Sequence, residues 1–435
     1  MKDNPDPEQY KPQLPLEVLN ELKVQNEQRK ILVLEYKSNH TKYRFEDLPQ
    51  CRAFLNIQPS ELIKIEFNRR EKPKVIMRIL SSEICLDHKH FHFFGHSNSQ
   101  LKARNVFFIS RSLVEIDELF KEMGDFSEIK STAKLSKRIG MLFSECKIVW
   151  ELDPKKTDLI KDISRGNNLL TDGCGYISER FLERIIKKFV SPNKVKYLPS
   201  IVQIRYQGYK GVLAIEPDLK FPYVQFRCSM LKFRGGKNLS FGIVEASRPY
   251  SFASLNAEIC TLLVELGISE DILRRKLSDY FKFLNDALIC EETALELLSY
   301  HREIETIEKL TTKGMLAVIE KVKTAVSSEL AKTLNQRKKR RISILVPDSR
   351  LLFGIAEPRS KLKPCEVFVR ITRKGRLETI CGNVIVTRNP CLHPGDVRVF
   401  KAVDHPEYHH LVDCILFSTH RDLQRSPAAD LAGVT

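Results

Sequence analysis

Residues 388–420 read RNPCLHPGDVRVFKAVDHPEYHHLVDCILFSTH. The composition of residues 393–396 (HPGD) predicts a turn, because Pro and Gly interrupt regular structure. The apolar run CILF at 414–417 is typical of a strand. It follows three other strand-like runs, ISILVPDSRLLFGIAE, EVFVRI and LETICGNVIVT. Residues 342–435 are therefore predicted to form a β region.

A second β region lies upstream of the first. Residues 165–250 contain QIRYQGYKGVLAIE, YVQFRCSMLKF and LSFGIVEAS, which are rich in β-branched and aromatic residues with Gly turns between them. From Ser254 to about Arg340 the apolar residues recur with a helical period. Ser269 is a predicted N-cap, followed by two acidic residues that the helix dipole favours. A helical segment thus separates the two β regions.

The N-terminal part is predicted to mix helices and strands. A helix is expected from about Leu16 to Leu34, where apolar residues have helical spacing. Between Leu62 and Phe108, the runs ELIKIEF, KVIMRIL and KHFHFF predict short strands. The runs LVEIDELFKEMG and STAKLSKRIGMLFSEC predict helices after them.

The composition is that of an ordinary globular protein with an excess of positive charge. The 435 residues are enough for two or three domains. The 71 Lys and Arg against 55 Asp and Glu suit a partner rich in phosphate, although many basic proteins have no such partner. No apolar run approaches the roughly 20 residues that span a bilayer, so no membrane association is expected. The 11 cysteines form no C-x-x-C pair, which predicts reduced thiols and a cytoplasmic or nuclear location.

Two lysines are candidates for binding phosphate. Lys210 and Lys232 lie in or beside strands rich in apolar residues. Gly208 and Gly211 flank Lys210, and glycine lets the backbone approach a ligand closely. An ammonium group is a compact point charge that suits a phosphate. The alternative reading is that both lysines lie on a solvated strand face, which is where most lysines lie.

Several motifs resemble signatures of the eukaryotic, cell-encoded RNA-dependent RNA polymerases of RNA silencing. The resemblance is carried by DGCGYIS, by R-Y-x-G-x-K-G within 203–213 and by R-x-S-M-x-K-F at 227–233. It extends upstream to GHSNSQLK and KRIGMLFS, and downstream to LVPDSRLLFGIAEP and GNVIVTRNPCLHPGDVR. Glu357 stands where the family has Asp, and Lys102 where it has Arg. These motifs occur in family order over roughly residues 65–420, which makes the resemblance specific.

The resemblance implies an α+β fold with two double-psi β-barrels, of which the second is incomplete. The expected division is a mixed α/β N-terminal domain at 1–160, the first barrel at 161–253, a helical connector at 254–341 and the truncated second barrel at 342–435. By the same resemblance, Lys210 and Lys232 contact the phosphates of the incoming nucleotide or of the RNA end.

The resemblance also implies RNA-templated RNA synthesis, in which single-stranded RNA is copied into double-stranded RNA from nucleoside triphosphates. Complete relatives are expected to use Mg²⁺ or Mn²⁺. The implied partners are a single-stranded RNA template, nucleoside triphosphates, silencing nucleases and Argonaute-type proteins. A fragment of a DNA-dependent RNA polymerase subunit is a weaker alternative, because that enzyme divides its two barrels between subunits.

The metal-binding loop of the family, Asp-Leu-Asp-Gly-Asp, is degenerate here. Asp430 matches the first aspartate, whereas Ala432 and Val434 replace the other two. A metal pair for nucleotidyl transfer needs several carboxylate oxygens on one loop. We therefore expect a fragment that lacks the metal-binding aspartates and is inactive as written. The alternative function is a non-catalytic RNA-binding pseudo-polymerase.

Two histidine groups and one basic run are further candidates. His88, His90 and His92 alternate on a predicted strand, with His96 nearby, but no cysteine spacing supports zinc, and no metal site is predicted. His405, His409, His410 and Cys414 give no better case. The run RKKRR at 337–341 suits a nuclear-import sequence, an RNA contact or the end of a helix.

Overall fold

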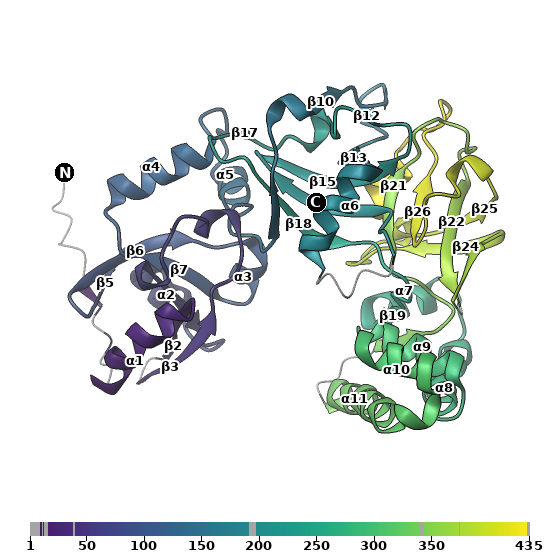
Figure 1. Ribbon diagram of the computed structural model, residues 1–435, viewed down its shortest axis with the longest axis horizontal. Coiled ribbons are helices and arrows are strands. Elements are labelled where there is room, and N and C mark those ends of the chain that lie inside the picture. The colour runs from purple at the N-terminus through teal and green to yellow at the C-terminus, as the bar shows by residue number, and fades with distance from the viewer. Residues whose placement is uncertain are drawn as a thin grey trace. The chain divides into compact units, whose positions relative to one another are not determined.

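The computed structural model describes residues 9–10, 12, 16–37, 40–190, 197–338, 343–373 and 375–432 (Figure 1). The chain divides into two units. Unit 1 comprises Met1–Pro154, Ile204–Lys210 and Leu231–Val244. Unit 2 comprises Lys155–Gln203, Gly211–Met230 and Glu245–Thr435. Strands β14 (Ile201–Tyr206) and β15 (Tyr209–Glu216) contribute residues to both units.

Unit 1 contains a seven-stranded sheet in the order β1-β5-β6-β7-β4-β2-β3 (Figure 1). The strands are β1 (Gln9–Tyr10), β2 (Lys30–Lys37), β3 (His40–Asp47), β4 (Leu62–Phe67), β5 (Glu83–Leu86), β6 (Lys89–Gly95) and β7 (Asn105–Ile109). The pairs β1–β5 and β2–β4 are parallel, and the other pairs are antiparallel.

Each face of this sheet contributes to a hydrophobic core. Ile63 and Ile65 of β4 pack in one core with Val18 of α1 (Leu16–Glu27) and Ile79 of α2 (Pro73–Ser81). Leu62 of the same strand belongs to a separate core on the other face. That core is rich in aromatic rings: Phe54, Phe94, Phe107, Phe143 and Phe233. Alternate side chains of a strand point to opposite faces, and beyond Leu62 the second face of β4 carries Lys64 and Glu66, which pair at 2.9 Å.

Two predicted elements of unit 1 are wrong. The expected helix from Leu16 to Leu34 ends at Glu27, and KILVLEYK forms β2 after a turn in which Arg29 has φ 61°. Strand β2 pairs with β3 and β4, and its apolar residues Ile31 to Leu34 are all buried. The run KVIMRIL lies in α2 instead of a strand. Pro73 begins this helix, at a position where an N–H group would have no intrahelical partner.

The predicted helices are confirmed as α4 (Leu113–Met123) and α5 (Thr132–Ile139). A capping box begins α4, in which Ser112 and Glu115 accept each other's backbone N–H. Ser131 caps α5 by accepting the N–H of Lys134. The remaining elements are α3 (Asn98–Lys102), the strand pair β8 (Gly124–Asp125) with β17 (Arg234–Gly235), and the pair β9 (Lys147–Glu151) with β18 (Ser240–Ala246).

The first β region is confirmed, with one helix added. In unit 2, β10 (Thr157–Ile160), β16 (Val224–Arg227), β13 (Cys174–Ser178) and the second half of β15 lie side by side. A short hairpin joins β11 (Ser164–Arg165) to β12 (Asn168–Leu169). Helix α6 (Glu179–Phe189) was not predicted. Its buried residues, Phe181, Leu182, Ile185 and Ile186, have helical spacing, and Ser178 caps it.

The helical prediction for residues 254–340 is confirmed from Ala257 to Lys338, whereas residues 254–256 belong to a strand, β19 (Ala253–Asn256). The helices are α7 (Ala257–Glu265), α8 (Glu270–Asp286), α9 (Glu291–Tyr300), α10 (Ile304–Lys313) and α11 (Ile319–Lys338). The hydroxyl of Ser269 accepts the N–H of Asp271, as expected of the N-cap. The RKKRR run begins at the end of α11, and its residues 339–341 lie outside the described residues. None of the described helices is long and apolar enough to cross a bilayer.

The second β region is also confirmed. The sheet has the order β21-β26-β22-β25-β24, with β23 paired to β22, and it mixes parallel and antiparallel pairs. Its strands are β21 (Phe353–Ala356), β22 (Glu366–Arg373), β23 (Arg376–Thr379), β24 (Gly382–Thr387), β25 (Val397–Ala402) and β26 (Cys414–Phe417). A further pair joins β19 (Ala253–Asn256) to β20 (Ser343–Val346).

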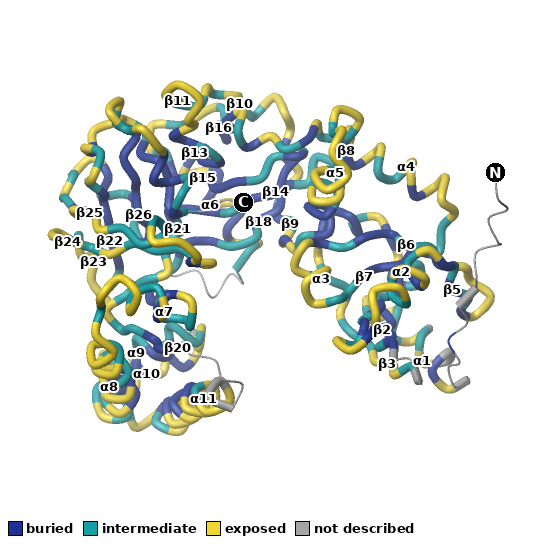
Figure 2. The backbone as a smooth tube through the Cα atoms, turned by 180° about the vertical axis from the view of Figure 1, so that it is seen from behind, coloured by how far each residue is buried: buried dark blue, intermediate teal, exposed yellow. Residues whose placement is uncertain are grey.

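The two β regions of unit 2 share one core. Cys174, Val212 and Ala214 of the first region belong to the same buried cluster as Phe368 and Leu416 of the second. Figure 2 shows β13, β26 and much of β22 as buried strands, whereas α8, α10 and α11 keep exposed outer faces. Unit 2 therefore holds residues 211–216 and 414–417 in one apolar interior, although about 200 residues separate them.

Candidate functional site

Lys210 and Lys232 lie beside one tight turn in unit 1. The turn between β14 and β15 consists of Gln207 and Gly208, with φ of 45° and 84°. The N–H of Lys232 donates to the carbonyl oxygen of Gly208 at 3.0 Å. Tyr209 and Leu231, the residues preceding the two lysines, form an isolated β-bridge. The structure thus holds the two lysines on neighbouring segments.

The glycines beside Lys210 serve the close packing of the chain itself. A Cβ on Gly208 would overlap the carbonyl oxygen of Phe233. A Cβ on Gly211 would overlap the carbonyl oxygen of Gly173. The expectation that these glycines admit a ligand is therefore corrected, because protein backbone fills the space at both positions.

The surroundings of Lys210 are cationic. Partial burial, the largest cause, and the nearby charges of Arg205, Lys232 and Arg138 together lower the pKa of Lys210 to about 8. Burial also lowers the pKa of Arg205 to about 10. The Nε atom of Arg205 has no hydrogen-bond partner within the described part of the chain. We call Lys210, Lys232, Arg205 and Arg138 the cation cluster. An anion placed among them would relieve both their repulsion and the cost of burial.

The cation cluster contains two residues that the sequence analysis did not single out. Arg205 is the first residue of R-Y-x-G-x-K-G, and Arg138 lies in the block KRIGMLFS. Both arginines stand inside motifs that were already quoted, so the motifs themselves could have indicated them. Their proximity in the fold could not have been predicted from sequence spacing, since about 70 residues separate them.

Other motif residues are structural. Arg227, the first residue of R-x-S-M-x-K-F, is buried and donates to the carbonyl oxygens of Cys174 and Lys161 and to the hydroxyl of Tyr176. Asp162 accepts both the N–H and the hydroxyl of Ser229. These contacts tie β13 and β16 together and leave no obvious catalytic task for Arg227.

Glu357 is a buried organiser of loops in the second β region. Its carboxylate accepts the N–H groups of Lys361, Leu362 and Thr419 at 2.9 to 3.1 Å, and the hydroxyl of Tyr408 at 2.8 Å. Burial, together with the charge of Glu357, raises the pKa of Tyr408, so the phenol remains a donor. The acidic residue at this family position therefore has a structural role here.

The turn predicted at residues 393–396 is confirmed. Pro394–Asp396 form a short 3₁₀ helix, and Asp396 accepts the N–H groups of Leu392 and His393. The first of these bonds is the largest cause of the lowered pKa of Asp396. His393 accepts the N–H of Gly395 at 3.0 Å through its Nδ1 atom. The side chains of this turn are therefore occupied by the turn itself.

Asp430 lies in unit 2, within a π-helical turn at Ala428–Ala432, and three arginines surround it. Its carboxylate pairs with Arg398 at 2.8 Å and with Arg425 at 2.8 Å, and Arg388 donates to its backbone carbonyl at 2.8 Å. Only about 14% of the Asp430 side chain is exposed. Among the described residues, no further carboxylate joins Asp430 in a group suited to a metal ion. One carboxylate held by two guanidinium groups does not fit a two-metal site.

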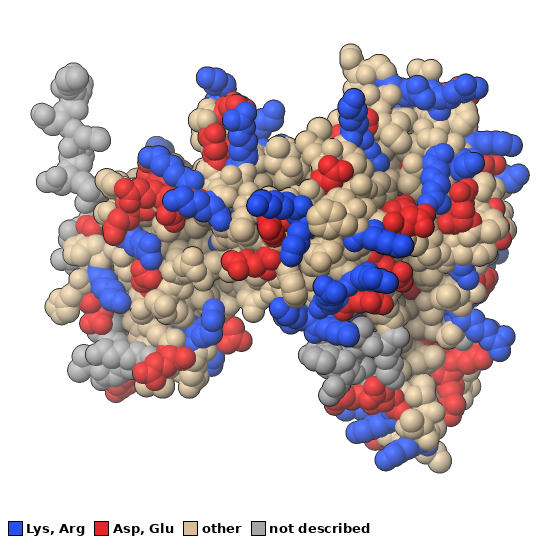
Figure 3. Space-filling view, turned by 45° about the horizontal axis from the view of Figure 1, so that its top comes forward, with Lys and Arg blue, Asp and Glu red and all other residues tan. Residues whose placement is uncertain are grey.

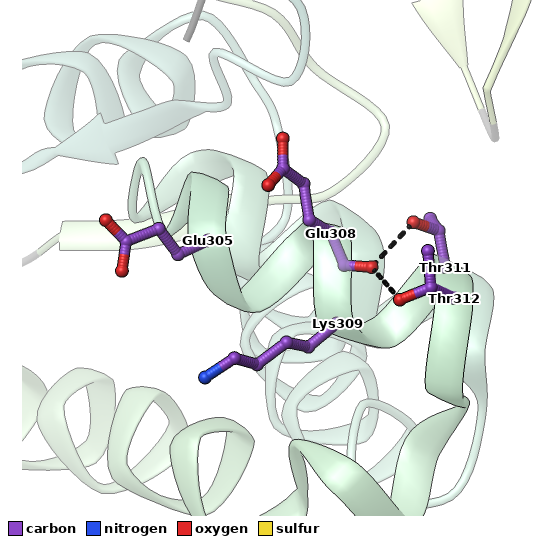
Figure 4. A pocket seen from close by; sticks show the side chains of 5 residues that line it. All are labelled: Glu305, Glu308, Lys309, Thr311 and Thr312. Carbon is purple, nitrogen blue, oxygen red and sulfur yellow. Dashed lines mark hydrogen bonds between the residues drawn. The ribbon is translucent and has the colours of Figure 1, made fainter. Parts of the chain in front are cut away.

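Within the described part of the chain, no site is formed by the candidates His405, His409, His410 and Cys414. His409 pairs with Asp404 at 2.6 Å, burial lowers the pKa of His410, and Cys414 lies in the core. A surface hollow is lined by Glu305, Glu308, Lys309, Thr311 and Thr312, all on α10 (Figure 4). Both threonine hydroxyls donate to the carbonyl oxygen of Glu308, so they serve the helix.

On the face drawn in Figure 3, Lys and Arg lie among Asp and Glu, without one continuous basic patch.

Comparisons with known proteins agree with the motifs. The sequence model of the family described as RNA dependent RNA polymerase matches residues 19–433. The chain is 30% identical over 381 residues to "Probable RNA-dependent RNA polymerase 1" of Oryza sativa subsp. japonica, covering 86% of this chain and 50% of that protein. It is 30% identical over 384 residues to "RNA-dependent RNA polymerase 1" of Schizosaccharomyces pombe, covering 80% of this chain and 30% of that protein.

A solved structure shows the same fold. The RNA dependent RNA polymerase QDE-1 from Thielavia terrestris matches 99% of this chain and 55% of its own chain, with a TM-score of 0.68 and 17% identity. The mixed α/β architecture is therefore that of this polymerase. The chain spans half or less of the length of the curated relatives it matches. With the family model matching nearly all of it, the chain belongs to the RNA-dependent RNA polymerase family.

Proposed function

We propose that this chain forms the RNA-binding and nucleotide-binding core of an RNA-directed RNA polymerase that makes double-stranded RNA in RNA silencing. The observation that carries the proposal is the cation cluster on family motifs. Lys210 has a pKa lowered by burial and by three neighbouring cations, and the negative charge of a bound polyphosphate would offset this local positive charge. The arginines of the cation cluster also suit a polyphosphate, because a guanidinium binds phosphate oxygens through two N–H groups.

In this proposal, each β region of the chain is a double-psi barrel, the second one incomplete. The mixed parallel and antiparallel pairing in both sheets, and the core that they share in unit 2, support this finer description. The four parts at 1–160, 161–253, 254–341 and 342–435 stay a prediction.

The chain's own residues have separable tasks. Lys210 and Lys232 attract and orient the phosphates of a nucleotide or an RNA end, and Arg205 and Arg138 strengthen the local positive potential. Mg²⁺ or Mn²⁺ would stabilise charge on the transferred phosphate in complete relatives. The residues around Asp430 do not fit that metal pair, so we derive no step from it and expect the chain as written to be inactive. Single-stranded RNA and nucleoside triphosphates are the proposed partners, with silencing nucleases and Argonaute-type proteins beyond them, in the cytoplasm or nucleus.

Replacing Lys210 with methionine is expected to weaken triphosphate binding roughly 10-fold or more. A hydrogen bond to a charged group contributes about 1.5–3 kcal/mol, and methionine keeps the length of the side chain without its charge. Wild-type affinity should fall as the pH rises through about 8, where the ammonium group of Lys210 loses its proton. The variant should lack this pH dependence. Isothermal titration with a non-hydrolysable triphosphate between pH 7 and 9 measures both effects.

The same variant should be more stable at pH 7, by about 1 kcal/mol after allowance for solvent screening. Below pH 8 Lys210 is protonated in both the folded and the unfolded state, so the cost of burying its charge is fully present. That cost declines between about pH 8 and the ordinary lysine value of 10.5, because only the unfolded state still binds the proton. Thermal unfolding of both proteins at pH 7 measures the difference.

Lys237→Met is the matched control, because Lys237 is an exposed lysine of the same unit. It should change neither the pH dependence nor the stability.

With single-stranded RNA, the Lys210→Met/Lys232→Met double variant should show a shallower salt dependence, by about 0.7 in the log–log slope for each lost phosphate contact. Unchanged RNA and triphosphate binding across a salt series would return both lysines to the role of ordinary surface residues.

The second candidate is a non-catalytic RNA-binding pseudo-polymerase, which the pairing of Asp430 with Arg398 and Arg425 favours. Both candidates predict RNA binding, and they differ in their response to the template base. A polymerase core should retain the nucleoside triphosphate complementary to the first unpaired template base at least about 10-fold better than a mismatched one. A pseudo-polymerase should not discriminate between them.

Filter retention of the four labelled triphosphates on a primed template, with Mg²⁺, separates the two candidates. We expect retention to follow the template base and no labelled nucleotide to enter RNA. Equal retention of all four triphosphates would favour the pseudo-polymerase. Incorporation into RNA would show that the chain is active despite Ala432 and Val434.

A further inference from the structure

Four potential metal ligands occupy one face of the β5–β6 hairpin in unit 1. The register pairs Cys85 with His90 and Ile84 with Phe91. Glu83 lies two residues before Cys85 on β5, and His92 lies two residues after His90 on β6. Alternate residues of a strand share a face, so these four residues form a two-by-two group. The opposite face carries the buried side chains of Ile84, Leu86 and Phe91.

The potential ligand atoms are close together. Nδ1 of His90 lies 3.4 Å from Sγ of Cys85 and 2.9 Å from Oε1 of Glu83. The three atoms lie within 4.8 Å of one another. Nε2 of His92 lies 3.6 Å from the same oxygen of Glu83. In a tetrahedral zinc site, two nitrogen or oxygen ligands lie about 3.3 Å apart, and a sulfur and a nitrogen about 3.6 Å, as the metal–ligand bond lengths require.

The hairpin turn fixes this arrangement. Asp87 and His88 have φ of 46° and 59°, which is the backbone of a two-residue type I′ turn. Such a turn places Leu86 opposite Lys89, and therefore Cys85 opposite His90. A shift by one residue would turn Ile84 and Phe91 out of the core, so burial holds the register as well.

The geometry points to a Zn²⁺ site formed by Cys85, His90 and Glu83, with His92 as the fourth ligand. One thiolate, two imidazoles and one carboxylate make a mixed sulfur–nitrogen–oxygen set, which suits zinc and not magnesium. The thiol of Cys85 gives its proton to solvent when its sulfur binds the metal. The ion bridges two adjacent strands, so it acts as a cross-strand staple. Only the histidines could be named from the sequence. Strand register, and not a C-x-x-C spacing, places Cys85 beside them.

The site is tested with the full chain, purified free of metal and titrated with Zn²⁺ against a chromophoric chelator. One ion should bind per chain, and Zn²⁺ should raise the melting temperature, because a ligand that binds only the folded state stabilises it. The Co²⁺-substituted protein should show a thiolate-to-metal charge-transfer band in the near ultraviolet. Mg²⁺ should neither bind nor shift the melting temperature.

Two variants remove ligands from the solvent-facing side of the hairpin. Cys85→Ser should lose the charge-transfer band and weaken Zn²⁺ binding at least 100-fold. Glu83→Gln keeps the shape of its side chain and should weaken binding at least 10-fold. Circular dichroism checks that each variant is folded, and either variant alone decides the result.

The matched controls are His88→Asn, at a turn position of the same hairpin where asparagine tolerates positive φ, and Cys228→Ser at an exposed cysteine. Both should bind Zn²⁺ like the wild type. Wild-type affinity or an unchanged charge-transfer band in Cys85→Ser would overturn the proposal, as would loss of that band in Cys228→Ser. Failure of the unaltered chain to bind Zn²⁺ would overturn it too.

Discussion

Replacing Gly208 with alanine is expected to lower the free energy of unfolding by roughly 3 kcal/mol or more. The added Cβ would overlap the carbonyl oxygen of Phe233, which belongs to backbone and cannot rotate away. The residue also has φ +84°, a conformation that costs L-residues about 1–3 kcal/mol. Overpacking costs about 1–3 kcal/mol more. Urea denaturation followed by tryptophan fluorescence or circular dichroism measures the loss.

This substitution should also damage the cation cluster. Relief of the overlap requires Phe233 to move, and the adjoining Lys232 donates its N–H to Gly208. Displacing that segment would separate Lys232 from Lys210 and weaken triphosphate binding even where the protein remains folded.

Gly267→Ala provides the control, because Gly267 has φ +93° and no atom within 4 Å of an added Cβ. It should show the backbone cost alone, about 1 kcal/mol, and leave triphosphate binding unchanged. If both variants lost the same stability, the contact between Gly208 and Phe233 would contribute nothing.

Glu357→Leu is expected to destabilise unit 2 by roughly 3–5 kcal/mol. The leucine would leave two buried backbone N–H groups, of Leu362 and Thr419, a partly buried one, of Lys361, and the hydroxyl of Tyr408 without their acceptor. Each unpaired buried donor costs about 1–3 kcal/mol, reduced where the loops relax enough to admit water. Glu357→Gln keeps one acceptor oxygen and should lose clearly less. Thermal and urea unfolding of the two variants measure the order.

Glu366→Leu is the comparison for this prediction. Glu366 accepts one exposed N–H, that of Lys363, at 3.0 Å, so its loss should cost less than about 1 kcal/mol. Equal stability of Glu357→Leu and Glu366→Leu would show that the network around Glu357 does not hold the loops.

The arrangement of helical and β regions could be predicted where local spacing decides it. The helical segment, which begins at Ala257 and not at Ser254, both β regions and the helices α4 and α5 were predicted from periodicity and from caps such as Ser269. The failures were residues 30–34, predicted as helix but part of β2, and residues 74–80, predicted as a strand but part of α2. An apolar run such as KILVLEYK suits either a helix or a strand buried on both faces, and only its partners β3 and β4 decide between them.

The candidate site was predicted in part. Lys210 and Lys232 were named from motifs, whereas Arg205 and Arg138 joined them only in the structure, through contacts that no spacing encodes. In the sequence, Glu357 is recognised only as an acidic residue at a family position. In the structure it is a buried carboxylate that accepts hydrogen bonds from four donors. Burial and long-range neighbours set the role of an ionisable group, and neither can be read from adjacent residues.

The amino-acid sequence alone determined the family and the order of its motifs, since both depend on which residues follow one another. The tertiary structure alone decided which charges meet. It brought three cations to Lys210, three arginines to Asp430 and Cys85 to His90. Such meetings depend on strand register and on the burial of apolar faces, which act between segments far apart in the chain.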